Sequence, residues 1–96
     1  MSSVEEIKNI IHKNKEGFSK KYFVSEIGIF GSYSRGDQNT DSDIDIIVSF
    51  TRPIGLEFID LAEELESLLG HKVDLVSKKG IKPLYYREIE KEIMYV

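Results

Sequence analysis

Two aspartates at the start of an apolar run constrain the fold of this chain more than any other feature. Asp43 and Asp45 flank Ile44, and three further apolar residues follow, from Ile46 to Val48. This pattern predicts a largely buried strand, in which residues two apart point to the same face of the sheet. Like charges placed side by side away from water are costly unless a cation lies between them. The segment therefore predicts a strand that presents two carboxylates on one face.

Two interpretations of this pair are open. An edge strand in a small antiparallel sheet can carry both carboxylates in solvent. Alternatively, the pair holds Mg²⁺, which takes oxygen ligands and commonly binds one or two carboxylates together with substrate phosphates. Asp74 favours the metal, because it interrupts a further predicted strand between Val73 and Leu75. If the two strands are neighbours, three carboxylates converge, and two Mg²⁺ ions held there would suit an in-line phosphoryl displacement.

A glycine-serine turn precedes the aspartates. Gly31 and Ser32 follow a predicted strand, and ten residues separate Ser32 from Asp43. Glycine at such a turn lets phosphate oxygens approach the main chain, and the serine adds a hydroxyl donor. Arg35 is placed to turn back to the same phosphates with its guanidinium. An ordinary strand-to-loop turn and a solvated arginine are the alternatives.

The hydrophobic pattern predicts a small mixed α/β sheet flanked by helices. Ser2 and Ser3 stand at capping-box spacing from Glu5 and Glu6, which indicates the start of the first helix. Gly70 is the expected C-cap of the most amphipathic helix, and Pro83 stands in the first turn of the last one. The expected order is a helix over 4–14, a strand ending at 30, a helical turn over 33–36, a strand over 44–48, a helix over 58–69, a strand over 71–77 and a final helix.

Length and composition narrow the function. The 96 residues predict one domain over 1–96, and a net charge of −4 without a dominant basic tract argues against general nucleic-acid binding. No apolar stretch approaches the length of a membrane span. The chain has no cysteine, which fits a reducing compartment, so we expect a cytoplasmic protein.

Together, Gly31-Ser32, the ten-residue spacing, Asp43-Ile44-Asp45 and the later Asp74 resemble the minimal nucleotidyltransferases of the DNA polymerase beta superfamily. The resemblance implies a polymerase-beta palm-like fold and transfer of a nucleoside monophosphate from a triphosphate to a hydroxyl. It also implies that all three aspartates bind Mg²⁺ and that Asp74 activates the acceptor. Gly31 and Ser32 would then hold the triphosphate, and Arg35 continues the same motif.

Enzymes of this size also resemble the antitoxin half of two-gene toxin–antitoxin modules. The resemblance implies a type VII-like antitoxin that transfers AMP from ATP to a tyrosine of a HEPN ribonuclease toxin. A binding antitoxin that acts by occlusion is one alternative, and transfer to a small-molecule hydroxyl by a homodimer is another. Apolar residues near the C-terminus offer a surface for a partner or for a homo-oligomer, and packing in the domain's own core is the favoured alternative for some of them: Tyr85, Tyr86, Met94 and Tyr95.

Overall fold

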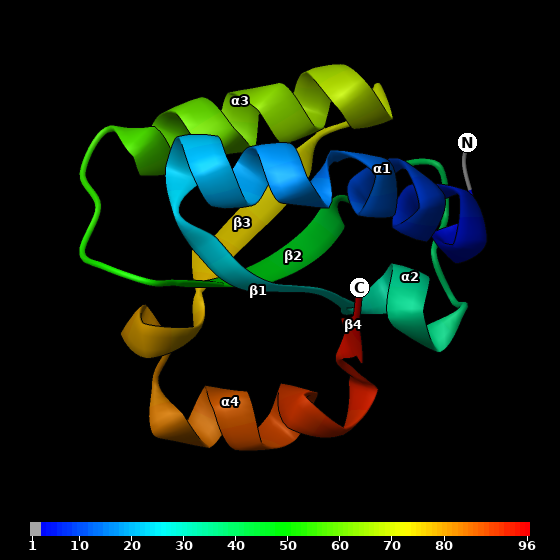
Figure 1. The fold of residues 1–96 in the computed structure, drawn as a ribbon. Helices are drawn as coiled ribbons and strands as arrows, with labels where there is room; N and C mark the ends of the chain where they lie inside the picture. The colour runs from blue at the N-terminus through cyan, green and yellow to red at the C-terminus, as the bar shows by residue number, and fades with distance from the viewer. Residues whose placement is uncertain (1–2) are drawn as a thin grey trace.

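The computed structural model describes residues 3–96 and shows a four-stranded sheet with helices on both of its faces (Figure 1). The elements in chain order are α1 (Val4–Tyr22), β1 (Val24–Phe30), α2 (Ser32–Arg35), β2 (Ile44–Phe50), α3 (Glu57–Leu69), β3 (Val73–Ser77), a 3₁₀ turn η1 (Lys78–Gly80), α4 (Pro83–Ile89), a second 3₁₀ turn η2 (Glu90–Glu92) and β4 (Met94–Tyr95). The predicted mixed α/β sheet flanked by helices is therefore confirmed.

The sheet has the order β3-β2-β1-β4. Strand β1 runs antiparallel to β2 and to β4, whereas β2 and β3 are parallel. A parallel pair needs a crossover connection, which α3 supplies. Helices α1 and α3 cover one face of the sheet, and α4 lies below the other face in Figure 1. The start of β2 therefore lies between the start of β3 and the end of β1.

Strands β1 and β2 are buried on both faces at their centres, which explains their nearly continuous apolar sequence. Ile44, Ile46 and Val48 of β2 belong to the main core, which they share with residues of α1 and α3. Ile47 instead joins a smaller cluster with Phe30 and with Ile89 of α4. Because side chains alternate along a strand, Asp45 points to the same face as Ile47, the α4 face.

Helix α1 is longer than its sequence predicts. We expected it to end near Asn14, because the following segment is polar and contains Gly17. The helix instead continues to Tyr22 and ends at Phe23, which adopts a left-handed conformation with φ 61°. Phe18 and Tyr22 are buried and extend the stripe that begins with Ile7 and Ile11. Burial of two aromatic side chains outweighs the low helix propensity of this stretch.

The helix boundaries set by caps agree better with the sequence. Ser3 and Glu6 form the expected capping box at the start of α1, whereas Ser2 lies outside the described residues. Gly70 ends α3 with φ 63°, as expected of a left-handed C-cap. Pro83 occupies the first turn of α4.

The C-terminal segment holds a strand that the sequence does not predict. Met94 and Tyr95 pair with Ile29 and Gly28 of β1. A Cβ at Gly28 would lie 2.7 Å from Cγ2 of Ile93, so glycine permits this close approach. The pairing brings η2 and α4 to the end of β1. Two residues carry no periodicity, which is why this strand has no sequence signal.

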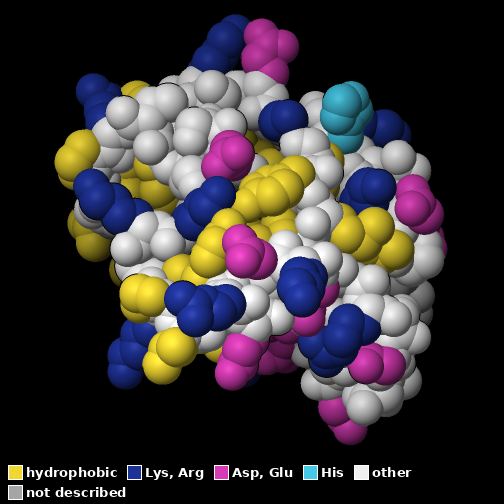
Figure 2. All heavy atoms as spheres, turned by 90° about the horizontal axis from the view of Figure 1, so that it is seen from below, with side chains coloured by type: hydrophobic (Ala, Val, Ile, Leu, Met, Phe, Trp, Pro, Cys, Tyr) yellow, Lys and Arg dark blue, Asp and Glu magenta, His cyan; other side chains and the backbone are white. Residues whose placement is uncertain are grey.

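Large apolar side chains remain exposed in this segment: Leu84 is 74% exposed, and Tyr85 and Tyr95 are each 46% exposed. Figure 2 shows the molecule from the α4 side, where hydrophobic side chains lie among interspersed acidic and basic ones.

No helix within residues 3–96 is both long enough and apolar enough to cross a membrane.

The second half of α1 yields the first testable prediction. Phe18 is 1% exposed and packs in the main core, so we expect Phe18→Ala to lower the free energy of unfolding by about 3 kcal/mol. Lys15 is exposed in the same stretch, and Lys15→Ala should change it by less than about 0.5 kcal/mol. Urea unfolding followed by circular dichroism measures both values. A Phe18→Ala protein as stable as wild type would contradict the observed packing.

Candidate active site

The Gly31 turn lies directly against the carboxylate of Asp45. Gly31 has φ 76°, a region that side chains rarely adopt, and a Cβ there would lie 2.0 Å from Oδ2 of Asp45. Only glycine fits this position. The strand pairing explains the approach, because Phe30 pairs with Asp45 across the antiparallel ladder. The end of β1 thus places the backbone of Gly31 and Ser32 beside the first residues of β2.

Asp74 lies opposite Asp45 on the neighbouring strand. The parallel ladder of β2 and β3 pairs these two residues directly, so their side chains extend from the same face of the sheet. Asp43 comes immediately before β2, which begins at Ile44, the residue at which the sequence predicts the strand to start. Asp43 and Asp45 are half-buried, whereas Asp74 is exposed. The strand pairing thus places Asp74 beside Asp45, whereas the convergence of all three aspartates on one metal site stays a prediction.

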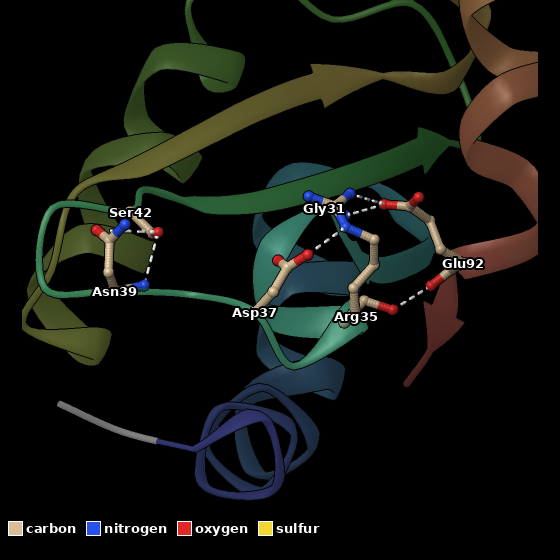
Figure 3. Close-up of polar contacts among 7 residues, drawn as sticks. Gly31, Arg35, Asp37, Asn39, Ser42 and Glu92 are labelled. Atoms are coloured by element: carbon tan, nitrogen blue, oxygen red, sulfur yellow. Dashed lines mark hydrogen bonds and ion pairs between the residues drawn. The ribbon is translucent and has the colours of Figure 1, made fainter.

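The loop that leads into Asp43 is held by its own side chains. The backbone N–H of Asn39 donates to Oγ of Ser42 at 3.0 Å (Figure 3). Oδ1 of Asn39 accepts from the N–H of Asp41 at 2.8 Å. Nε2 of His71 lies 2.5 Å from the carbonyl oxygen of Ser42, which ties the loop to the segment before β3. These contacts fix the point from which Asp43 extends. Asp41 is thus a turn residue, as its sequence context indicates.

The surroundings of Asp45 disfavour the ionised form of its carboxyl. Burial, followed by the negative charges of Asp74 and Asp43, raises the pKa of its carboxyl to about 6, while Arg35 acts in the opposite direction. This is the combination of desolvation and like charge that often marks functional sites. A cation bound beside Asp45 would remove the repulsion. Within residues 3–96, no three His, Cys, Asp or Glu side chains are already arranged as a metal site, so the metal-ligand roles stay a prediction.

Arg35 is engaged by two carboxylates. Its Nε lies 3.1 Å from Oδ2 of Asp37, and its Nη1 lies 3.0 Å from Oε2 of Glu92 (Figure 3). The same oxygen of Glu92 accepts a hydrogen bond from the N–H of Gly31 at 2.5 Å. The hydroxyl of Ser34 donates to the backbone carbonyl of Glu92. The contact of Arg35 with phosphate stays a prediction. Its guanidinium lies near Gly31, because both residues contact the same oxygen of Glu92.

Sequence reasoning missed Glu92 altogether. It sits in a charged stretch, Glu88 to Glu92, that reads as a solvated helix end. Its place in the site depends on the pairing of β4 with β1, which has no sequence signal. Only the fold brings this residue, 61 positions later in the chain, to Gly31.

A pocket of about 430 Å³ opens at these residues. Its lining combines the Gly31 turn and Asp45 with Tyr85 and Glu88 of α4 and with Glu92. A larger cavity of about 690 Å³ lies at the other ends of β2 and β3, beside Phe50, Phe58 and Lys78. No carboxylate lines this larger cavity. Of the residues predicted for the site, Gly31, Arg35 and Asp45 line the smaller pocket.

The sequence pattern of the nucleotidyltransferase domain family matches residues 7–96. The chain belongs to this family. MntA, a protein adenylyltransferase of Thermococcus cleftensis, is 44% identical over 97 residues that cover 100% of this chain and 98% of the relative. A Methanocaldococcus jannaschii protein, provisionally named a protein adenylyltransferase, is 45% identical over 100 residues that cover 100% of both chains. The predicted family and enzyme class are confirmed.

Solved structures confirm the nucleotidyltransferase fold. A crystal structure of a toxin–antitoxin with AMP-PNP matches with a TM-score of 0.75 and 31% identity, covering 91% of this chain and 69% of that one. A structure provisionally assigned to a minimal nucleotidyltransferase matches with a TM-score of 0.75 and 27% identity, covering 92% and 93%. A nucleotidyltransferase takes a nucleotide as substrate and typically uses a divalent metal.

The raised pKa of Asp45 predicts how stability depends on pH. Since the folded protein keeps a proton on this carboxyl up to about pH 6, while the unfolded chain releases it near pH 4, this group makes stability fall as the pH rises through that window. Asp45→Asn should therefore raise the free energy of unfolding at pH 7.5 without divalent metal, by about 1 kcal/mol once partial solvent exposure is allowed for.

The gain from Asp45→Asn should disappear near pH 4, where the wild-type carboxyl is protonated in both states. Thermal unfolding at several pH values with a chelator present measures it, and Asp41→Asn, a change at an exposed loop aspartate, is the matched control. A loss of stability at pH 7.5, or an equal gain in the control, would contradict the crowding of negative charge at Asp45.

Proposed function

We propose that this nucleotidyltransferase transfers AMP from ATP to a protein hydroxyl, with a tyrosine of a HEPN-type toxin as the acceptor. The observation that carries the proposal is the register of the site. Asp45 and Asp74 lie opposite each other on parallel strands, and the Gly31 backbone lies against Asp45. The full-length similarity to proteins named protein adenylyltransferases supports the choice of reaction.

Asp43, Asp45 and Asp74 are the residues that would hold Mg²⁺, and we propose two ions. The raised pKa of Asp45 supports this assignment, because burial and then the negative charges of Asp74 and Asp43 disfavour its ionised form. Oxygen-only ligands suit Mg²⁺. When bound, Mg²⁺ supplies positive charge to the phosphates and to the leaving pyrophosphate.

The Gly31 turn and Arg35 would hold the triphosphate. Gly31 lines the pocket and Ser32 follows it in the chain, so the N–H of Gly31 and the hydroxyl of Ser32 are the candidate donors. The positive φ of Gly31 favours a residue without a side chain. Arg35 lines the same pocket, and its guanidinium fork suits phosphate oxygens. This arrangement would turn the α-phosphate toward Asp45 and Asp74.

The acceptor oxygen attacks the α-phosphorus, the bond from that phosphorus to the bridging oxygen breaks, and pyrophosphate leaves. Asp74 is exposed, so it is the aspartate best placed to meet a hydroxyl brought by another protein. We assign to its carboxylate the proton of the acceptor hydroxyl. Asp45, half-buried against Gly31, holds its position and does not need to reach the acceptor.

The partner would supply the acceptor. Residues 1–96 form one nucleotidyltransferase domain in this proposal, and the exposed Leu84, Tyr85 and Tyr95 offer a surface near the pocket. A match to a solved toxin–antitoxin supports a toxin as that partner. The protein would then act as an antitoxin, type VII-like, in the cytoplasm where ATP is available.

The test combines the protein with labelled ATP, Mg²⁺ and the product of its neighbouring gene. We expect label on the product of the neighbouring gene. Asp43→Asn/Asp45→Asn should reduce the rate of labelling by at least about a hundredfold, because the metal loses its carboxylate ligands. The control Asp41→Asn/Asp60→Asn removes the same two charges at exposed positions and should label normally.

Three results would contradict the proposal. One is absence of label when the two proteins form a stable complex. Another is an Asp43→Asn/Asp45→Asn protein that still protects cells from the toxin, which would favour occlusion. The third is transfer to a small hydroxyl compound with no label on any protein.

A further inference from the structure

Glu92 contacts both of the groups that the proposed function assigns to phosphate. Its Oε2 accepts from the N–H of Gly31 at 2.5 Å and lies 3.0 Å from Nη1 of Arg35. One carboxylate oxygen therefore takes two donors that come from different parts of the turn. Figure 3 shows the side chain reaching from the C-terminal segment across to Gly31 and Arg35. These are the contacts that an oxygen of a bound anion would make.

We propose that Glu92 is an internal anion that occupies part of the triphosphate site, and that a nucleoside triphosphate must displace its carboxylate to bind productively. The inference rests on the proposed function, because it takes the Gly31 turn as the phosphate site. Carboxylate and phosphate oxygens are the same kind of acceptor for a backbone N–H and a guanidinium. Two anions cannot share one amide hydrogen, so the two compete.

The surrounding charges support displacement over a purely structural role. Glu92 adds a negative charge to a site that already holds Asp43, Asp45 and Asp74, and it contributes to the raised pKa of Asp45. Glu88 lines the same pocket. The Glu92 carboxylate is therefore attracted by its two hydrogen-bond donors and repelled by the neighbouring carboxylates. A triphosphate that brings its own cation would relieve the repulsion as it takes over the donors.

The main chain at Glu92 is held independently of its side chain. Ser34 donates its hydroxyl to the backbone carbonyl of Glu92, and β4 pairs with β1 two residues later. Arg35 keeps a second ion pair with Asp37. When the Glu92 carboxylate leaves, these contacts remain, so Arg35 stays beside the turn. Displacement therefore needs a change of side-chain rotamer and no unfolding of the C-terminal segment.

Glu92→Gln and Glu88→Gln form a matched pair for the test. Each removes one negative charge from the pocket at nearly constant volume, but only Glu92 contacts Gly31 and Arg35. Isothermal titration calorimetry with Mg²⁺ and α,β-methylene ATP, which cannot transfer AMP, measures affinity without turnover. We expect Glu92→Gln to bind at least about threefold more tightly than wild type, a size typical of a partly exposed ion pair.

Glu88→Gln should change the affinity by less than Glu92→Gln does. Glu92→Asp is the second variant, because it keeps the charge but shortens the reach to Gly31, and it should also tighten binding. Circular dichroism confirms that each variant is folded.

Unchanged or weaker binding by folded Glu92→Gln, or an equal gain in Glu88→Gln, would overturn the inference. If wild type still binds the analogue and labels its partner, the proposed function survives that result. If neither wild type nor any variant binds the analogue, the phosphate site itself is wrong and both proposals fail.

Discussion

The geometry of the candidate site depends on the close approach of the Gly31 backbone to the Asp45 carboxylate. A glycine with positive φ lets the end of β1 lie on the first residues of β2, where any other residue would place a Cβ 2.0 Å from a carboxylate oxygen. The pairing of β2 with β3 then sets Asp74 beside Asp45. Two strand registers and one glycine therefore place Asp45 between Gly31 and Asp74, the residues to which we assign nucleotidyl transfer.

The negative charge of the half-buried Asp45 carboxylate lowers the free energy of unfolding at neutral pH. The carboxyl of Asp45 has its pKa raised to about 6 because burial and its acidic neighbours disfavour the ionised form. Native proteins usually avoid such crowding unless a ligand relieves it. Glu92 meets the opposite need, since it satisfies the N–H of Gly31 and neutralises part of the charge of Arg35. We therefore expect a bound cation to stabilise the acidic group around Asp45, and a bound anion to replace Glu92 at Arg35 and the N–H of Gly31.

The sequence predicts the parts of the site that are local. The glycine-serine turn, the paired aspartates and Asp74 follow from residue type and spacing, and the family confirms the enzyme class. The length of α1 could not be predicted, because burial of Phe18 and Tyr22 overrides a polar, glycine-containing stretch. Glu92 could not be predicted either, since its contact depends on a two-residue strand that pairs with β1 and that is too short to show a periodic pattern.

One measurement tests the central claim most directly: a crystal structure of the protein with Mn²⁺ and α,β-methylene ATP, with anomalous scattering used to locate the metal. The account predicts a metal peak bound by Asp43 and Asp45, with phosphate oxygens at the N–H of Gly31 and at Ser32. A nucleotide bound instead in the cavity beside Phe50 and Phe58, or a metal away from the aspartates, would contradict it.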